Sequence, residues 1–148
     1  MAYIPHGARW YVAEIVVEIQ VEGDARNIVH RNLILVNATS PEDAYQRAMD
    51  LGRQSEDTYK NPESRTVVSR FRGLGQLDVV HDRLEHGAEL RFFEDVSVPG
   101  EQIERWLKSK EQLNVFREID PSKGPDYSCK EVVEQALRSA GHDSQNQE

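Results

Sequence analysis

The densest group of ionisable side chains is the run Asp78-Val79-Val80-His81-Asp82-Arg83-Leu84-Glu85-His86. If a helix began at Asp82, then Asp82, Glu85 and His86 would share one face and could bind a metal ion or form a general acid–base pair. The run instead has the composition of a strand end and a turn, and turns are usually solvated and charged. The chain contains no closed zinc motif and no H-E-x-x-H sequence. We therefore predict no metal site, and a metal-dependent enzyme using Asp78–His86 is the weakest of three functional hypotheses.

The candidate nucleophiles are isolated in the sequence. Cys129 lies at the predicted start of a late helix and could pair with a distant histidine, but a lone cysteine is more often a small packing residue. No G-x-S-x-G motif is present, and Gly73-Leu74-Gly75 lacks the third glycine and the following helix of a phosphate loop. We therefore predict no catalytic residue and no cofactor, and the sequence argues against an enzyme.

A set of polar and aromatic residues gives a better candidate for binding: Trp10, Tyr11, Tyr59, Asn61 and Glu89. Aromatic rings with polar tips suit a small pocket or a protein-binding patch. The alternative is that Trp10 and Tyr59 close the ends of a hydrophobic core, because burial of large aromatics is common. In that interpretation Asn61 closes its own turn by a side-chain hydrogen bond. Of the two, the sequence favours this structural interpretation, and the five residues stay candidates for binding.

Composition excludes several classes of partner. The chain has 148 residues, enough for one core, and carries 18 basic against 26 acidic residues for a net charge of −8. Nucleic-acid binding needs clustered positive charge, so we expect no nucleic acid partner. The longest apolar run is far below the roughly 18 residues of a membrane span, and the first residues do not resemble a signal peptide. A single cysteine favours a reducing compartment, so we predict a cytoplasmic protein.

Two strands and a helix are predicted in the first third of the chain. Residues 11–22 alternate between an apolar face and a wet face that carries Glu14, Glu18 and Gln20. Residues 28–37 are apolar on both faces, which favours a strand inside the sheet rather than at its edge. Ser40 is the predicted N-cap of the following helix, with Pro41 in its first turn and Ala44 and Ala48 on its buried face.

Three shorter strands are predicted next, over residues 65–73, 77–80 and 89–96, after a turn at residues 59–63. The expected fold class is α+β: an antiparallel sheet of about five strands in the order β-β-α-β-β-β, with one helix across a face. Arg70 and Arg72 are expected to face Glu14 and Glu18 across this sheet. The core residues that we expect to be buried together are Ile15, Val17, Leu35, Ala48 and Phe71.

The character of the chain changes after Val96. A helix is predicted from about Pro99, with Ile103, Trp106, Leu107 and Leu113 at helical spacing. A connector rich in proline and glycine spans residues 120–126, and a last helix begins at a capping box, Ser128-Cys129-Lys130-Glu131, and is closed by Gly141. The predicted organisation is a sheet domain over 1–96, a helical extension over 97–141 and a disordered tail over 142–148.

The first part of the chain resembles a known family, the bacterial domain of unknown function numbered 4288. Residues about 9–95 contain the features that carry the resemblance: Trp10-Tyr11-x-Ala13, Ala38, Pro41-Glu42-x-Ala44, Ala48, Gly52, Tyr59-x-Asn61, Phe71-x-Gly73 and Gly87-x-Glu89. Residues 97–148 are an addition to the usual short form. The resemblance implies the fold of the domain and no activity, cofactor or catalytic residue.

The sequence leaves the biological role unknown and favours an acidic, non-enzymatic interaction module that self-associates, with a protein partner as a further expectation. A small-molecule-binding domain with a pocket between helix and sheet is the alternative. The apolar stripe after residue 97 needs a partner surface, and two-fold homodimers are the commonest soluble oligomers. We therefore predict a homodimer with Trp106, Leu107 and Leu113 as candidate interface residues.

Overall fold

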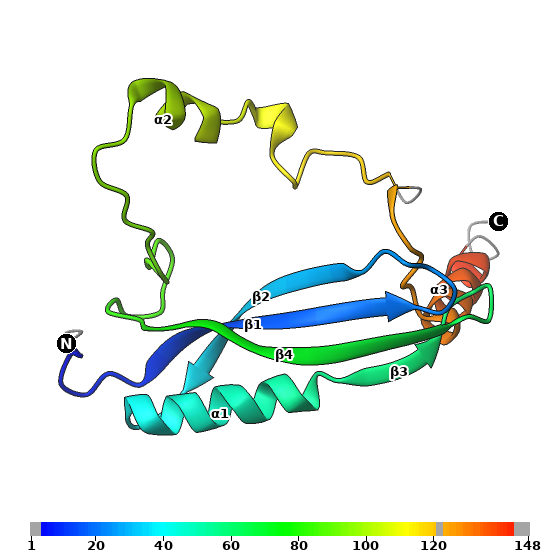
Figure 1. The fold of residues 1–148 in the computed structure, drawn as a ribbon, viewed down its shortest axis with the longest axis horizontal. Helices are drawn as coiled ribbons and strands as arrows, with labels where there is room; N and C mark the ends of the chain where they lie inside the picture. Colours follow the sequence, from blue (N-terminus) through cyan, green and yellow to red (C-terminus); the bar gives the residue numbers. More distant parts are fainter. Residues whose placement is uncertain (1–3, 121–122, 144–148) are drawn as a thin grey trace. The chain divides into compact units, whose positions relative to one another are not determined.

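The computed structural model of the protein describes residues 4–120 and 123–143. Four strands form one antiparallel sheet in the order β2-β1-β4-β3, with α1 lying along it (Figure 1). The elements are, in chain order, β1 (Trp10–Val21), β2 (Ile28–Asn37), α1 (Pro41–Gln54), β3 (Asp57–Lys60), β4 (Thr66–Val79), α2 (Gly100–Trp106), η1 (Lys110–Gln112) and α3 (Lys130–Asp143). The α+β class and the antiparallel sheet are confirmed.

The chain forms two compact units. The first, the sheet unit, consists of the described parts of residues 1–91 and 124–148, and the second consists of residues 92–123. No helix among the described residues is long and apolar enough to cross a membrane.

The predicted strand count was wrong by one. A single strand, β4, runs through the Gly73–Gly75 segment, where two register shifts against β1 absorb the extra residues as bulges. Gly73 has a φ of 136°, which a residue with a side chain would rarely adopt. The strand predicted over 89–96 does not form, and Phe92, Phe93 and Val96 are exposed. Alternating apolar residues are not sufficient for a strand, because its backbone also needs a neighbouring strand to bond to.

The turn predicted over 59–63 begins later than expected, because residues 57–60 pair with β4 as the short strand β3. This strand forms one edge of the sheet and β2 forms the other. The prediction that residues 28–37 lie inside the sheet was therefore wrong. Apolar residues on both faces of a strand usually indicate an interior position, but here the outward face of β2 is exposed instead.

The core lies on the face of the sheet that α1 covers. The predicted apolar face of β1 is buried throughout, from Tyr11 to Val21 at every second residue. Two clusters share it: one joins Tyr11 and Ala13 to α1 and β2, and the other joins Ile15 and Val17 to Val67 on β4. Ala44 and Ala48 bring α1 onto the first cluster. Small side chains at these two positions allow the helix to approach the sheet closely.

Four of the five predicted core residues lie on the core side of the sheet unit. Ile15, Val17 and Ala48 are buried, and Phe71 is half-buried against the second cluster. Leu35 was predicted wrongly, because it pairs with Val12 on the opposite face and is 43% exposed. Its neighbours Ile34 and Val36 point to the core instead. A strand with apolar residues at consecutive positions does not reveal its phase, whereas the alternation in β1 does.

The start of α1 is as predicted. The Ser40 side chain accepts a hydrogen bond from the Asp43 backbone N–H at 3.1 Å, and Pro41 occupies the first turn. The Asp43 carboxylate accepts from the Thr39 backbone N–H at 3.0 Å, and this bond, with the Arg47 guanidinium, lowers the pKa of Asp43. Two otherwise free N–H groups at the start of the helix region are satisfied by these side chains.

The elements after residue 96 differ from the prediction in their bounds. The helix α2 ends at Trp106, and only the single turn η1 follows before Leu113. Before α3, the Ser128 hydroxyl donates to the Asp126 carboxylate at 2.6 Å. The helix α3 also continues through Gly141 to Asp143. Most of the tail predicted over 142–148 lies outside the described residues.

Ser40→Ala is expected to lower the free energy of unfolding by about 1 kcal/mol, because the Asp43 N–H loses its acceptor. The denaturant midpoint measures this change. Ser139→Ala is the control, since the Ser139 hydroxyl only donates to a carbonyl within α3 and caps nothing. Equal midpoints for the two variants would contradict the assigned cap.

Gly52→Ala is expected to destabilise the protein by about 1–3 kcal/mol, because an added Cβ would overlap the Phe71 ring. Helix propensity alone predicts the opposite sign, since alanine favours a helix interior over glycine by about 1 kcal/mol. Gly141→Ala is the matched control: it is also helical and has open space around it. Thermal denaturation of both variants separates the two effects, and stabilisation by Gly52→Ala would contradict the close approach of α1 to β4.

Candidate functional site

The five residues predicted as a binding set lie at two ends of the sheet unit. Trp10 and Tyr11 begin β1, and the residue paired with Trp10 at the end of β4 is Val80, whose N–H donates to the Trp10 carbonyl at 2.9 Å. Tyr59 pairs with Val67, which in turn pairs with Val21 at the far end of β1. The 12 residues of β1 separate these ends by roughly 35 Å at about 3.3 Å per residue.

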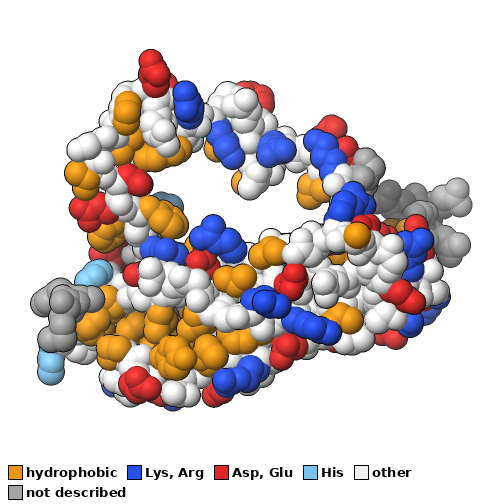
Figure 2. All heavy atoms as spheres, viewed as in Figure 1, with side chains coloured by type: hydrophobic (Ala, Val, Ile, Leu, Met, Phe, Trp, Pro, Cys, Tyr) orange, Lys and Arg blue, Asp and Glu red, His pale blue; other side chains and the backbone are white. Residues whose placement is uncertain are grey.

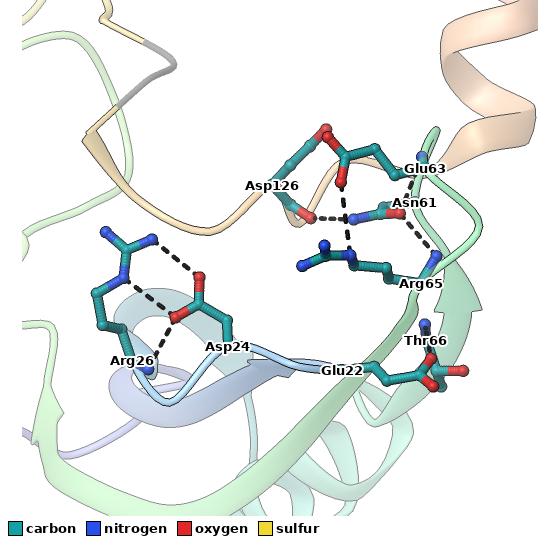
Figure 3. Close-up of polar contacts among 8 residues, drawn as sticks. All are labelled: Glu22, Asp24, Arg26, Asn61, Glu63, Arg65, Thr66 and Asp126. Atoms are coloured by element: carbon teal, nitrogen blue, oxygen red, sulfur yellow. Dashed lines mark hydrogen bonds and ion pairs between the residues drawn. The ribbon is translucent and has the colours of Figure 1, made fainter.

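Asn61 organises the turn between β3 and β4. Its side chain is buried, with the residue 1% exposed, and its Oδ1 accepts from the backbone N–H groups of Glu63 at 3.0 Å and Arg65 at 2.9 Å. This is the turn-closing role that one of the two interpretations predicted. Its Nδ2 makes a third bond, donating to the Asp126 carbonyl at 2.9 Å (Figure 3). Asn61 therefore joins the turn to a segment 65 residues later in the chain.

A second contact strengthens this junction, which we call the Asn61 clamp (Asn61, Tyr59, Asp126 and Tyr127). The Tyr59 hydroxyl donates to the Tyr127 carbonyl. The Tyr127 ring meets the His30 ring edge to face, with centroids 5.4 Å apart. The clamp holds the start of the C-terminal segment against the turn, and α3 follows at the same end of the sheet (Figure 1).

Partial burial raises the pKa of the Tyr59 hydroxyl, with the nearby Cys129 and Asp57 adding to the rise. A raised folded-state pKa means that the neutral phenol is favoured in the folded protein. Its contribution to stability is present below the ordinary tyrosine pKa of about 10 and is lost as the pH rises through the folded-state value. The clamp is therefore insensitive to pH in the neutral range as far as Tyr59 is concerned.

The other end of the sheet carries Trp10, which is partly exposed and lines a hollow of about 450 Å³. The wall of this hollow comes from the segment before β1 and the segment after β4: Pro5, His6, Gly7, Ala8, Arg9, Val80, His81, Asp82, Arg83 and Leu84. Glu89 lies close by in the chain, and its backbone N–H donates to the Asp82 carboxylate at 2.9 Å. Tyr11 is instead buried in the core.

The Asp78–His86 run is spread over the end of β4 and the irregular segment after it. The Asp78 carboxylate lies 3.1 Å from the Arg91 guanidinium, and the Asp82 carboxylate is engaged by Glu89. Within the described residues no three histidine, cysteine or carboxylate side chains converge as metal ligands. Cys129 is half-buried at the start of α3, on the clamp side of the sheet unit.

The sequence of residues 10–91 matches the family described as "Domain of unknown function (DUF4288)". The match covers more than half of the chain. The protein belongs to the DUF4288 family. No curated protein and no solved structure matches the chain.

The DUF4288 match ends before the C-terminal segment, so the Asn61 clamp joins a residue of the family domain to residues outside it. Asp126 and Tyr127 contribute only backbone carbonyls to its hydrogen bonds, and for that reason sequence reasoning could not find them. The proline and glycine in the preceding connector indicated only a flexible joint.

The outer face of the DUF4288 sheet, away from α1, is the third candidate region. Its centre is a buried carboxylate: Glu14, predicted on a wet face, is 6% exposed. Glu14 forms an ion pair with Arg31 at 2.8 Å and lies against Gly75, where a Cβ would overlap its carboxylate. Glu18 meets Arg72 at 3.3 Å and accepts from Asn27 at 2.6 Å. The predicted ladder is thus present at Glu18, whereas the ion-pair partner of Glu14 is Arg31 of β2.

Beside these charges the outer face is apolar along β2. Val29, Leu33 and Leu35 are 51%, 57% and 43% exposed, and their partners on β1 place them on the same face as Val12 and Glu14. We call these three residues the β2 row. The sequence signal for the row is the run Leu33-Ile34-Leu35-Val36, but a strand that is apolar on both faces predicts an interior position, so the exposure of the row was not predicted.

The predicted interface residues belong to the second unit and to the segment around α2. Trp106 is the last residue of α2, Leu107 follows it, and Leu113 follows η1. All three side chains are exposed, as are Val115, Phe116 and Ile119. Over the sheet unit, Figure 2 shows hydrophobic side chains gathered towards the end where the chain begins, with acidic and basic side chains interspersed elsewhere.

Asn61→Asp is expected to release the C-terminal segment while keeping the turn. An aspartate oxygen still accepts from Glu63 and Arg65, but the donor to the Asp126 carbonyl is replaced by an oxygen that repels it. Backbone hydrogen exchange of residues 126–130 measures the release, and the expected loss of stability is about 1–3 kcal/mol. Asn114→Asp, an exposed site of the second unit, is the matched control. Unchanged exchange in Asn61→Asp would show that Asn61 does not hold the segment.

Proposed function

We propose that this protein is a non-enzymatic, self-associating protein-interaction module that acts as a homodimer in the cytoplasm. The observation that carries the proposal is the β2 row, Val29, Leu33 and Leu35, on the outer face of the sheet. Large apolar side chains that are half exposed and grouped on one face mark interaction surfaces more often than isolated ones do. In the β2 row Leu33 and Leu35 are neighbours on this face, and Arg31 lies between them and Val29. The cytoplasmic location rests on the single cysteine of the chain.

The charge distribution supports self-association at this place. The chain has 26 acidic residues and a net charge of −8, so two copies repel each other over most of their surfaces. The strand β2, from Ile28 to Asn37, contains no acidic residue and one arginine. Arg31 is itself neutralised by Glu14 at 2.8 Å. An apolar, acid-free strand is where two such chains approach each other at the lowest electrostatic cost.

The second unit supplies a further apolar surface. Trp106, Leu107 and Leu113 are exposed and remain the sequence-based candidates for an interface. We propose that these side chains serve a protein partner or a second contact between copies. Comparing a variant of the β2 row with a variant of Trp106 distinguishes which surface carries self-association.

A small-molecule-binding role is the second candidate, and the hollow of about 450 Å³ beside Trp10 favours it. Its wall contains Arg9 and Arg83, so an anionic ligand with a ring for Trp10 is the best chemical match. A ligand screen by thermal shift tests this role. A compound that raises the Tm of the native protein but not of Trp10→Ala would favour it.

Leu33→Lys is expected to convert the homodimer to a monomer, because a charge would be buried among apolar side chains in the contact. Light scattering of the full chain over a range of concentrations measures the mass. Tyr45→Lys is the matched control, since Tyr45 is also a half-exposed side chain but lies on α1. Trp106→Lys tests the second unit in the same way. A native protein that is monomeric at every concentration would contradict self-association.

A further inference from the structure

The free edge of β2 can be assigned residue by residue from the hydrogen bonds around it. The Ala38 N–H donates to the Arg9 carbonyl at 2.9 Å, which continues the β1–β2 register by one pair. Opposite residues in an antiparallel ladder alternate between bonded and non-bonded pairs. The even-numbered residues of β2 therefore direct their N–H and C=O groups towards β1.

The odd-numbered residues of β2 direct their backbone N–H and C=O groups away from the sheet. These residues are Val29, Arg31, Leu33, Leu35 and Asn37. The bond from the Val80 N–H to the Trp10 carbonyl, at 2.9 Å, gives the same phase from the other side of β1. Among the described residues, no backbone partner is found for these five outward-directed pairs of groups. The unpaired edge and the β2 row thus belong to the same alternate residues.

The two edges of the sheet differ in how well they are protected against pairing with a strand of another chain. The strand β3 is four residues long, contains Asp57 and Lys60, and is followed by Pro62. Short length, charge and proline are the usual means by which proteins prevent edge pairing. The strand β2 is 10 residues long, has no lysine or proline, and pairs with β1 without a register shift. Its one charged side chain, Arg31, is paired with Glu14 of the neighbouring strand, and the strand is neither short nor interrupted by proline, so its edge is a template for another strand.

We infer that β2 pairs edge to edge with β2 of a second copy, antiparallel about a two-fold axis at Asn32, so that two four-stranded sheets become one. This inference rests on the proposed self-association and specifies its geometry. In this register Val29 lies opposite Leu35 of the other copy, and Ile28 lies opposite Val36. Apolar residues meet in these outer pairs, whereas next to the axis Leu33 lies opposite Arg31 and Ile34 lies opposite His30. The Asn32 amides meet on the axis, where they can bond to each other.

The occupant is a second copy because the strand is complementary to itself. In a symmetric antiparallel pair, each residue of β2 lies opposite a β2 residue of the other copy. Because β2 contains no acidic residue, no two carboxylates face each other across the pair. The axis at Asn32 also keeps the two Arg31 side chains from lying directly opposite each other. An axis at Arg31 would oppose like charges across the strands, which is unfavourable.

Disulfide formation tests the axis directly. Residues on a two-fold axis of antiparallel strands have Cα atoms about 4.5–5.5 Å apart, within the range of a disulfide. Asn32→Cys, in a Cys129→Ser background, is expected to give a covalent dimer under mild oxidation. Asn37→Cys is the matched control: it is an exposed asparagine of the same strand, and in this register it lies roughly 33 Å from its copy at about 3.3 Å per residue.

Hydrogen exchange of the unmodified chain gives an independent readout that needs no folded variant. The amides of Val29, Arg31, Leu33 and Leu35 are expected to exchange more slowly as the protein concentration rises. Those of His30 and Ile34, already bonded to β1, are expected to stay unchanged. Two results in a dimeric protein would overturn edge pairing and leave self-association standing. One is that Asn32→Cys crosslinks no faster than Asn37→Cys. The other is that the exchange rates of the odd-numbered amides do not depend on protein concentration. A protein that is monomeric at every concentration would overturn both self-association and edge pairing.

Discussion

The pairing of β1 with strands on both of its sides is the constraint on which the rest of the fold depends. Its odd-numbered residues bond to β2 and its even-numbered residues bond to β4, so the backbone of the central strand is satisfied on both sides. The same alternation places Tyr11, Ile15 and Val17 against the core. Because side chains alternate with a period of two, the phase of β1 decides which residues of β2 and β4 are buried.

The bulges in β4 follow from this constraint. Two register shifts let a strand with glycines at 73 and 75 stay paired with β1 along its length. Gly75 also leaves room for the Glu14 carboxylate, which is buried on the outer face and paired with Arg31. A buried carboxylate is tolerated when it is paired, so the charge on the outer face is matched inside the sheet itself.

The sheet unit has different surfaces at its two ends and along its β2 edge. At one end, the buried amide of Asn61 bonds the β3–β4 turn and the C-terminal segment into one structure. At the other end, Trp10 lines a hollow that opens to solvent. Between them, the β2 edge presents unpaired backbone and apolar side chains together. Among the described residues, this edge offers both hydrogen bonds and apolar contact, which is why it carries the functional proposal.

The sequence determined the elements whose signals are local. The alternation in β1 gave its buried face, the cap at Ser40 gave the start of α1, and the scattered family positions gave the DUF4288 domain. Tertiary structure decided where each strand lies in the sheet. Leu33 and Leu35 are exposed because they lie on the face of the sheet away from α1, whereas Val36 of the same strand is buried on the core face, and no property of an apolar run specifies which of its faces will be covered. Tertiary structure also decided the Asn61 clamp. The distant partners of Asn61 and Tyr59 are backbone carbonyls, which every residue carries, so no residue type in the sequence indicates them.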